Sequence, residues 1–354
     1  MPIVAFPDLL AGDENLSVLR EVEAFQRLGE VSSTSRFELR DEQAFATELL
    51  QYKGQRLSPG VLTVAALGWD PPERSTHFQV SLLSVSEDKV VIPSMPSPDE
   101  ERVLWKELSK LNTKSITLLQ GEGLDYGMVW ERRVDLQTHT PDQTKDSGLK
   151  ASLPEGDLEN DLRRLIDDSI NILSEQEFNL RRIDQGHAAI NLAWPWGQGE
   201  RHTVSNLALR LGYLWRVFAS SFEIRGLARL SGLKVEKITP IRGLNGAKLL
   251  NGLKKDLNSV AVLDFGEFRG EEHYEEKRYL ARELGNSLVQ PLLDWSLENK
   301  RPLTMIAAGL SNQGIIAFVR EKPSERDYFP FDERIINDRK LPEIALSKVL
   351  GAEV

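Results

Sequence analysis

Acidic side chains follow two of the apolar segments that are typical of buried strands. Asp8 comes two residues after Ile3–Phe6, and Asp264 comes directly after Ser259–Leu263. Carboxylate oxygens are the ligands that Mg²⁺ and Mn²⁺ prefer in proteins. If the two strands are neighbours in a parallel sheet, both carboxylates lie at its carboxyl edge, where α/β proteins place ligands. The pattern therefore indicates a candidate site for a divalent cation.

More acidic residues follow Asp264, and they have a structural interpretation as well. Glu267, Glu271 and Glu272 lie in an acidic run that begins a predicted helix. Negative charge near a helix N-terminus is favoured by the helix dipole and by solvation. Asp8 could likewise act as a helix cap or turn residue instead of a ligand. His273, at the same helix start, is expected to be a surface histidine.

Composition limits the classes of function. The chain has 354 residues, no cysteine, five histidines and a net charge of −10. The lack of cysteine excludes disulfides, thiolate zinc sites and a cysteine nucleophile. The acidic balance argues against nucleic-acid binding and against binding to anionic membranes. The first residues carry no basic signal-peptide region and no apolar run approaches a membrane span, so we expect a cytoplasmic protein.

The order of predicted elements indicates an α/β fold. The length suggests about two domains. In the second half of the sequence, short apolar strands alternate with amphipathic helices, which favours a mostly parallel sheet covered on both faces. The predicted strands there are Val235–Ile238, Ser259–Leu263, Leu303–Ala308 and Ile315–Val319. A smaller α/β unit is expected before them, and Asp135–Gly156 is expected to be an irregular polar loop.

The segment Asn191–Gly199 is a short apolar run with two tryptophans that ends in Gly-Gln-Gly. It is typical of a buried strand that ends in a tight turn. Together with four other segments, in order along the chain, it resembles the archaeal type of cofactor-independent phosphoglycerate mutases, in the alkaline-phosphatase superfamily. The segments that carry the resemblance are Leu67–Pro71, Asn179–Gly199, Arg225–Leu233, Val289–Leu293 and Phe331–Leu350.

The resemblance implies an architecture and a chemistry. It implies an alkaline-phosphatase-like core made of residues 1–71 and 186–354, with a smaller inserted α/β lid domain at residues 72–185. Mutases of this family transfer a phosphoryl group through a serine nucleophile, assisted by two divalent metals. Aspartate and histidine side chains hold those metals.

Several positions of this sequence depart from the family pattern. Asp8 matches the first metal ligand, but Leu9 replaces the glycine that follows it. The nucleophile position falls on Pro59, with Ser58 beside it, and Ser58-Pro59-Gly60 is also typical of an ordinary turn. Glu267 and Glu271 stand where an aspartate and a histidine are expected.

The clearest departure lies after the predicted strand Leu303–Ala308. The family has an Asp-His pair and a further histidine there, whereas this chain has only the polar turn Gly309–Gly314 before the next strand. The sidechains of such a turn are poor ligands for divalent metals. The remaining histidines, His77, His139, His187 and His202, are expected to be structural or surface residues.

Three hypotheses follow. The first is a degenerate homologue that has lost two-metal phosphoryl transfer, needs no cofactor and binds a small anionic, phosphorylated ligand or a protein partner. The second is an active Mn²⁺- or Mg²⁺-dependent mutase, phosphotransferase or hydrolase with a rebuilt site: Asp8, Asp264, Glu267 and Glu271 as ligands and Ser58 as nucleophile. The third is a structural or assembly protein with the same fold.

Overall fold

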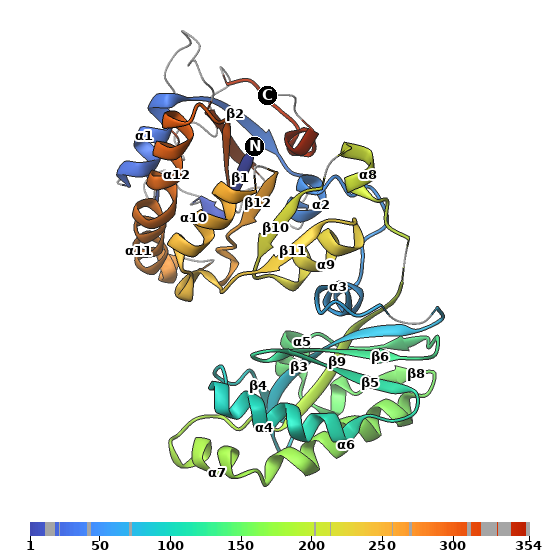
Figure 1. The fold of residues 1–354 in the computed structure, drawn as a ribbon. Coiled ribbons are helices and arrows are strands. Elements are labelled where there is room, and N and C mark those ends of the chain that lie inside the picture. Colours follow the sequence, from blue (N-terminus) through green and yellow to red (C-terminus); the bar gives the residue numbers. More distant parts are fainter. Residues whose placement is uncertain are drawn as a thin grey trace. The chain divides into compact units, whose positions relative to one another are not determined.

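The computed structural model describes residues 1–354 except 11–17, 21, 41–43, 71–72, 202, 213, 257, 269–270, 310–312, 320–330, 332–340, 352–354 and the side chain of Glu271. The chain forms two compact units (Figure 1). Unit 1 consists of Met1–Gly54 and Val204–Val354, and unit 2 of Gln55–Thr203. Among the described residues, no helix is long and apolar enough to cross a bilayer.

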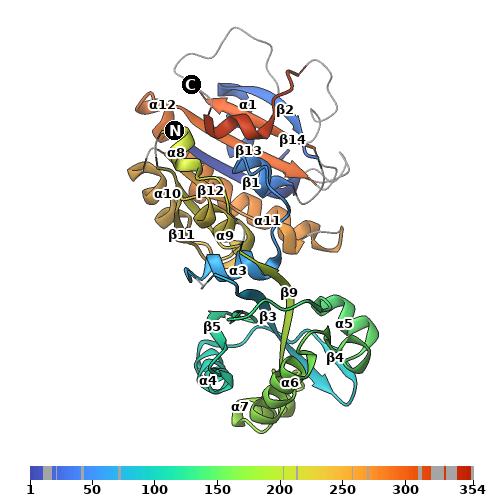
Figure 2. The ribbon, with the colours of Figure 1, turned by 90° about the vertical axis from the view of Figure 1, so that its right-hand side faces the viewer.

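Unit 1 is built on a seven-stranded sheet in the order β11-β10-β12-β1-β13-β14-β2 (Figures 1 and 2). Its strands are β1 (Pro2–Leu10), β2 (Ser32–Glu38), β10 (Arg216–Ala219), β11 (Lys234–Lys237), β12 (Ser259–Val262), β13 (Leu303–Gly309) and β14 (Gln313–Val319). The first five strands in the order pair in parallel, whereas β14 pairs antiparallel with both β13 and β2. The predicted mostly parallel sheet is therefore confirmed.

Helices cover the sheet of unit 1, as the alternating sequence pattern predicts. They are α1 (Glu23–Val31), α2 (Phe45–Leu49), α8 (Leu207–Leu211), α9 (Phe222–Leu230), α10 (Gly246–Lys255), α11 (Tyr274–Leu284) and α12 (Gln290–Glu298). Helices α1, α10, α11 and α12 share one apolar core with β1 and β13, and α2 contacts α9 elsewhere on the unit (Figure 1). Between α11 and α12, a π-helical turn at Gly285–Val289 precedes Pro291, which lacks the N–H that a regular helix needs.

Unit 2 contains a second, antiparallel sheet. Its strands run in the order β4-β3-β6-β5, and β9 pairs with the edge of β3 that faces away from β6. Strands β7 and β8 form a separate pair. The strands are β3 (Thr76–Ser86), β4 (Lys89–Val91), β5 (Ile116–Glu122), β6 (Asp125–Trp130), β7 (Leu136–Gln137), β8 (Glu155–Gly156) and β9 (Leu192–Glu200).

The helices of unit 2 lie on both faces of this sheet. They are α3 (Pro59–Ala66), α4 (Pro98–Leu108), α5 (Pro141–Ser147), α6 (Glu159–Ser174) and α7 (Glu177–Asp184). Strand β3 alternates between its two faces, as a half-buried strand must. Phe78, Val80 and Leu82 pack into a core with α4, α6 and α7. Gln79, on the opposite face, accepts a hydrogen bond from Thr63 of α3 at 3.3 Å.

The tryptophan-rich segment differs from its prediction. Strand β9 continues through Gly-Gln-Gly to Glu200, so the predicted turn at Gly197–Gly199 is wrong. These glycines instead let α3 approach the strand. A Cβ at Gly197 would lie 2.9 Å from the Cβ of Pro59, and a Cβ at Gly199 would collide with the side chain of Ser58. Glycines in an apolar segment predict a chain reversal, but here they allow close contact between a helix and a strand.

The same contacts explain where unit 2 begins and ends. Helix α3 packs on β3 and β9, and β9 pairs with β3 along its length. Both segments therefore belong to unit 2, which spans 55–203, whereas the resemblance implied a lid at residues 72–185. Unit 2 is inserted between the two parts of unit 1 along the chain.

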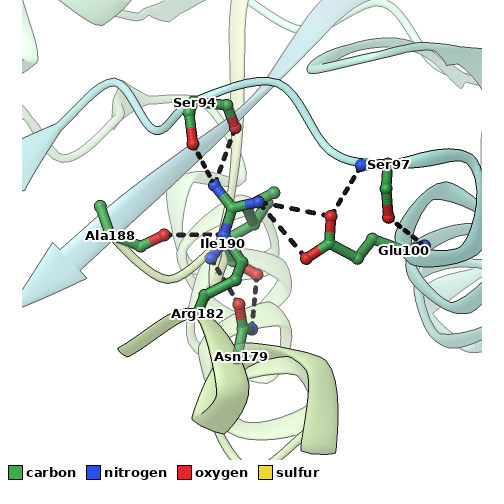
Figure 3. Close-up of polar contacts among 7 residues, drawn as sticks. All are labelled: Ser94, Ser97, Glu100, Asn179, Arg182, Ala188 and Ile190. Atoms are coloured by element: carbon green, nitrogen blue, oxygen red, sulfur yellow. Dashed lines mark hydrogen bonds and ion pairs between the residues drawn. The ribbon is translucent and has the colours of Figure 1, made fainter. Parts of the chain in front are cut away.

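A buried arginine ties together three segments of unit 2 (Figure 3). Arg182 of α7 donates to the backbone oxygen of Ala188 at 2.9 Å and to the backbone and side-chain oxygens of Ser94 at 2.9 and 2.7 Å. Its guanidinium also lies 3.4 Å from the Glu100 carboxylate of α4. Asn179, one turn earlier, donates to the backbone oxygen of Ile190 at 2.9 Å. These contacts fix the segment that leads into β9.

We predict that Arg182→Ala lowers the free energy of unfolding by roughly 3 kcal/mol, because it leaves Glu100 and the Ser94 and Ala188 oxygens without their partner. Urea denaturation at pH 7 measures the change. Arg181→Ala, on the exposed side of the same helix with a 3.8 Å pair to Glu177, is the matched control and should cost at most about 0.5 kcal/mol. Equal losses in the two variants would contradict the assigned role.

Candidate functional site

The candidate site of unit 1 lies where its central parallel strands end. Strand β1 pairs with both β12 and β13, so the residues that follow these strands lie along one edge of the sheet. Asp8 lies two residues before the end of β1, and Asp264 lies two residues after the end of β12. Asp8 has a φ of 59°, in the left-handed region. Such a conformation is uncommon for a residue with a side chain, although aspartate adopts it more readily than most.

The structure brings Asp8 and Asp264 together over one glycine. The N–H of Gly266 donates to Oδ1 of Asp264 at 2.8 Å. A Cβ placed on Gly266 would lie 3.1 Å from that oxygen and 3.4 Å from Oδ2 of Asp8. Both carboxylates therefore border the same backbone position, and both are half-buried. A side chain at residue 266 would crowd this space, so the glycine keeps it open.

The glutamates that follow take other positions. Glu267, in the short helical turn Gly266–Phe268, is exposed. Its charge acts on Arg242, whose pKa is raised chiefly by hydrogen bonds to Glu276 at 2.8 and 3.0 Å. The Arg242 guanidinium also lies 4.9 Å from the ring centroid of Phe268. Glu267 thus has a cationic neighbour, which reduces its attraction for a metal ion.

Two predicted features of the site fall partly or wholly outside the described residues. Glu271 begins the helical turn Glu271–His273, but its side chain is not described. Residues 310–312 of the polar turn between β13 and β14 are also outside that part of the chain. Within the described residues, no group of three or more aspartate, glutamate or histidine side chains is arranged to hold a metal ion.

His273 and His77 each have structural surroundings of their own. His273 is the single histidine in the sequence of unit 1, and its ring packs edge-on against Phe268 with 6.3 Å between centroids. His77 is buried in unit 2, where one ring nitrogen lies 3.0 Å from the Ser75 hydroxyl. Burial, aided by the charge of Arg201, lowers the pKa of His77 to about 4, so its imidazole is neutral at pH 7. His202 lies outside the described residues.

Ser58, the candidate nucleophile, belongs to unit 2 and serves as a helix cap. Its side chain accepts a hydrogen bond from the N–H of Val61 at 3.3 Å, and Pro59 occupies the first turn of α3. Serine at the cap and proline just after it are the residues that a helix start favours. This arrangement accounts for Ser58-Pro59 without a catalytic role, and the role as nucleophile stays a prediction.

A second cluster of polar groups was missed in the sequence. On the face of the unit 2 sheet opposite its core, Oδ1 of Asp125 accepts hydrogen bonds from Gln79 at 2.9 Å and from Ser81 at 3.0 Å. Ser81 in turn accepts from the indole N–H of Trp196 at 2.9 Å. Burial raises the pKa of Asp125 against these hydrogen bonds, and the nearby Glu122 raises it further. The alternation of polar residues at 77, 79 and 81 was the available signal.

Comparisons with known proteins give a consistent answer. No protein-family model matches the chain. The 2,3-bisphosphoglycerate-independent phosphoglycerate mutase of Methanosarcina mazei is 22% identical over 278 residues, which cover 72% of this chain and 70% of the relative. The 2,3-bisphosphoglycerate-independent phosphoglycerate mutase 2 of Methanothermobacter thermautotrophicus is 23% identical over 163 residues, 46% of this chain and 38% of that protein.

Solved structures share the fold along the whole chain. The PH0037 protein from Pyrococcus horikoshii matches with a TM-score of 0.70 and 12% identity, over 99% of this chain and 95% of its own. The cofactor-independent phosphoglycerate mutase from Thermoplasma acidophilum matches with a TM-score of 0.60 and 15% identity, over 99% and 97%. The two sequence relatives and the second of these structures are all named as phosphoglycerate mutases.

The raised pKa of Asp125 generates a pH-dependent prediction. The folded state favours the protonated carboxyl, so its stabilising effect is complete below the pKa of the unfolded chain and is lost as pH rises through the folded pKa. Asp125→Asn keeps the Oδ1 acceptor and removes the ionisation. Its free energy of unfolding should approach that of the wild type as pH falls toward 4 and exceed it at pH 7. Denaturation at several pH values measures the difference.

The control for this prediction is Glu131→Gln, which removes one exposed negative charge from the same unit. It should shift stability little and without the same pH dependence. A difference between Asp125→Asn and the wild type that stays constant from pH 4 to pH 7 would refute a raised pKa at this site.

Proposed function

We propose that this divergent relative of the 2,3-bisphosphoglycerate-independent phosphoglycerate mutases keeps their fold but has lost two-metal phosphoryl transfer. It acts instead by binding, with a small phosphorylated ligand or a protein partner as the bound species. The premise is the sequence similarity of this chain to named phosphoglycerate mutases, together with the fold that it shares with one of them. The loss of the reaction is the step that the proposal adds.

The observation that carries the proposal is the donor set at the carboxyl edge of the unit 1 sheet. Two carboxylates, Asp8 and Asp264, border the same position there. A centre with two divalent ions needs several oxygen and nitrogen ligands for each ion. The sequence of unit 1 supplies one histidine, His273, whose ring packs on Phe268. The described residues of unit 1 therefore supply fewer ligands than the pair of metals that the family implies would need.

The charge balance of the site supports the same conclusion. Without bound cations, adjacent carboxylates repel a phosphate group, because the Coulomb energy between like charges a few ångströms apart is unfavourable even near the surface. Arg242, a neighbouring cation, already pairs with Glu276 and faces Glu267. Phosphoryl transfer at this edge would therefore lack the electrostatic support that it requires. Of the two proposed bound species, the same repulsion favours a protein partner over a phosphorylated ligand at this position.

The serine position supports it too. Ser58 caps α3 through Val61, and the residue aligned with the family nucleophile is Pro59, which has no nucleophilic group. Within the described part of the chain, the Ser58 side chain lies against Val61 of α3 and Gly199 of β9, and neither residue is a base. Its hydroxyl is thus explained by helix capping.

One observation favours the second candidate function, an active enzyme with a rebuilt carboxylate site. Asp8 is held in a left-handed backbone conformation beside Asp264, and strained residues gather at functional sites. In this alternative, Asp8, Asp264, Glu267 and Glu271 supply the oxygen ligands for Mn²⁺ or Mg²⁺. Ser58 is the nucleophile.

A mutase assay separates the two candidates. The protein is incubated with 3-phosphoglycerate and Mn²⁺, formation of 2-phosphoglycerate is followed, and the Methanosarcina mazei relative serves as the positive control. We expect no turnover above background for the wild type, for Asp8→Ala or for Ser58→Ala. Turnover that Asp8→Ala abolishes would overturn the proposal and establish the alternative.

The same preparation tests binding. A thermal shift with 3-phosphoglycerate in the presence of a chelator reports a ligand that stabilises the folded state. A concentration-dependent rise in Tm supports binding of a phosphorylated ligand. If Tm does not rise, the bound species must be a protein partner. Failure to isolate any stable complex by affinity purification from a lysate of the source cells would then contradict the binding proposal.

A further inference from the structure

The polar cluster around Asp125 has features that the fold of unit 2 does not require. It consists of Thr63, Gln79, Ser81, Asp125 and Trp196, and we call it the Asp125 cluster. Gln79, Ser81 and Asp125 lie on neighbouring strands, in register, with Ser81 directly opposite Asp125. Trp196 of β9 lies directly opposite Gln79. The cluster therefore forms one continuous polar patch across three strands.

Hydrogen bonds hold one oxygen of the Asp125 carboxyl and leave the other available. Oδ1 accepts from Gln79 and from Ser81. The amide of Gln79 is itself oriented by the hydroxyl of Thr63, and the hydroxyl of Ser81 by the indole of Trp196. Within the described residues, Oδ2 makes no hydrogen bond or ion pair. The Asp125 side chain is partly exposed at this position.

The electrostatics of the cluster call for a positive charge. Asp125 is half-buried, and the charged group that acts on it is another acid, Glu122. Asp125 forms no salt bridge with any lysine or arginine of the described residues. A carboxylate that is removed from water gains most from an opposite charge at hydrogen-bond distance. The chain as a whole carries a net charge of −10, which also attracts cations.

The aromatic residue narrows the class of ligand. The indole of Trp196 is half-buried, and its N–H already donates to Ser81. Part of the ring packs against the apolar cluster that contains Leu83 and Trp194, so only the exposed remainder of the ring can contact a ligand. Tryptophan is the aromatic side chain that attracts organic cations best. A neutral hydroxyl ligand would satisfy Oδ2 but would leave the negative charge uncompensated.

We propose that the Asp125 cluster is a binding site for a primary ammonium group, with Oδ2 of Asp125 as its acceptor and Trp196 beside it. The ammonium can belong to a small diamine or to a lysine side chain of a peptide. The site lies within unit 2 and uses none of the residues of the candidate site in unit 1. It therefore goes beyond the proposed function and does not depend on it.

The test follows the indole N–H signals by NMR at physiological salt and pH 7.5, with the Trp196 signal assigned from a Trp196→Phe spectrum. Putrescine is titrated against 1,4-butanediol, which has the same length but no charge. We expect the Trp196 signal to shift saturably with putrescine and to stay in place with butanediol. A Trp196 signal that does not respond to putrescine, or responds equally to both, would overturn the proposal.

A second arm distinguishes the two sources of the ammonium group. Nα-acetyl-lysine amide carries the same group on a peptide-like stem. If it saturates the site at lower concentration than putrescine, the natural ligand is a lysine side chain; if putrescine binds more tightly, the ligand is a small diamine. Either order supports an ammonium site, provided that butanediol fails to bind.

Variants connect the binding to the carboxylate. Asp125→Asn keeps the hydrogen bonds at Oδ1 and removes the charge, and we expect it to weaken putrescine binding about ten-fold or more. Glu131→Gln removes one exposed charge from the same unit and should leave the affinity unchanged, which controls for nonspecific attraction. Circular dichroism verifies that both variants are folded. Equal affinities in folded Asp125→Asn and Glu131→Gln would contradict the proposal.

Discussion

The account depends on one geometric constraint, the meeting of two carboxylates at a single backbone position. Because β1 pairs in parallel with β12 and β13, the residues after these strands share an edge, and Asp8 and Asp264 both border Gly266. Two neighbouring carboxylates can hold a cation, but two cations need more ligands than the described part of this edge supplies. The proposed loss of two-metal chemistry rests on this constraint.

Much of the fold could be predicted from periodicity. Apolar runs and amphipathic spacing indicated the parallel sheet of unit 1 and its helices, and they also predicted that Asp264 follows a strand. The role of Gly197–Gly199 could not be predicted, because glycine is typical both of turns and of close helix contacts. That ambiguity is why β9 was expected to end at a turn, whereas it continues along β3 to Glu200.

The candidate sites show a similar division. The capping role of Ser58 agrees with the turn-like reading of Ser58-Pro59-Gly60, since both use local sequence. The Asp125 cluster could not be foreseen, because it joins β3, β6 and β9 through cross-strand register that only the folded sheet defines. Alternating polar residues in β3 are typical of a strand with one polar face, but they do not specify which acid lies opposite Ser81.

The most direct test of the central claim is the number of Mn²⁺ ions that the purified protein binds, measured by electron paramagnetic resonance of free Mn²⁺. The donor set of unit 1 predicts at most one weakly bound ion per chain, and Asp264→Asn should weaken even that binding. Two Mn²⁺ ions bound per chain at micromolar concentration, and lost together in Asp264→Asn, would contradict the account.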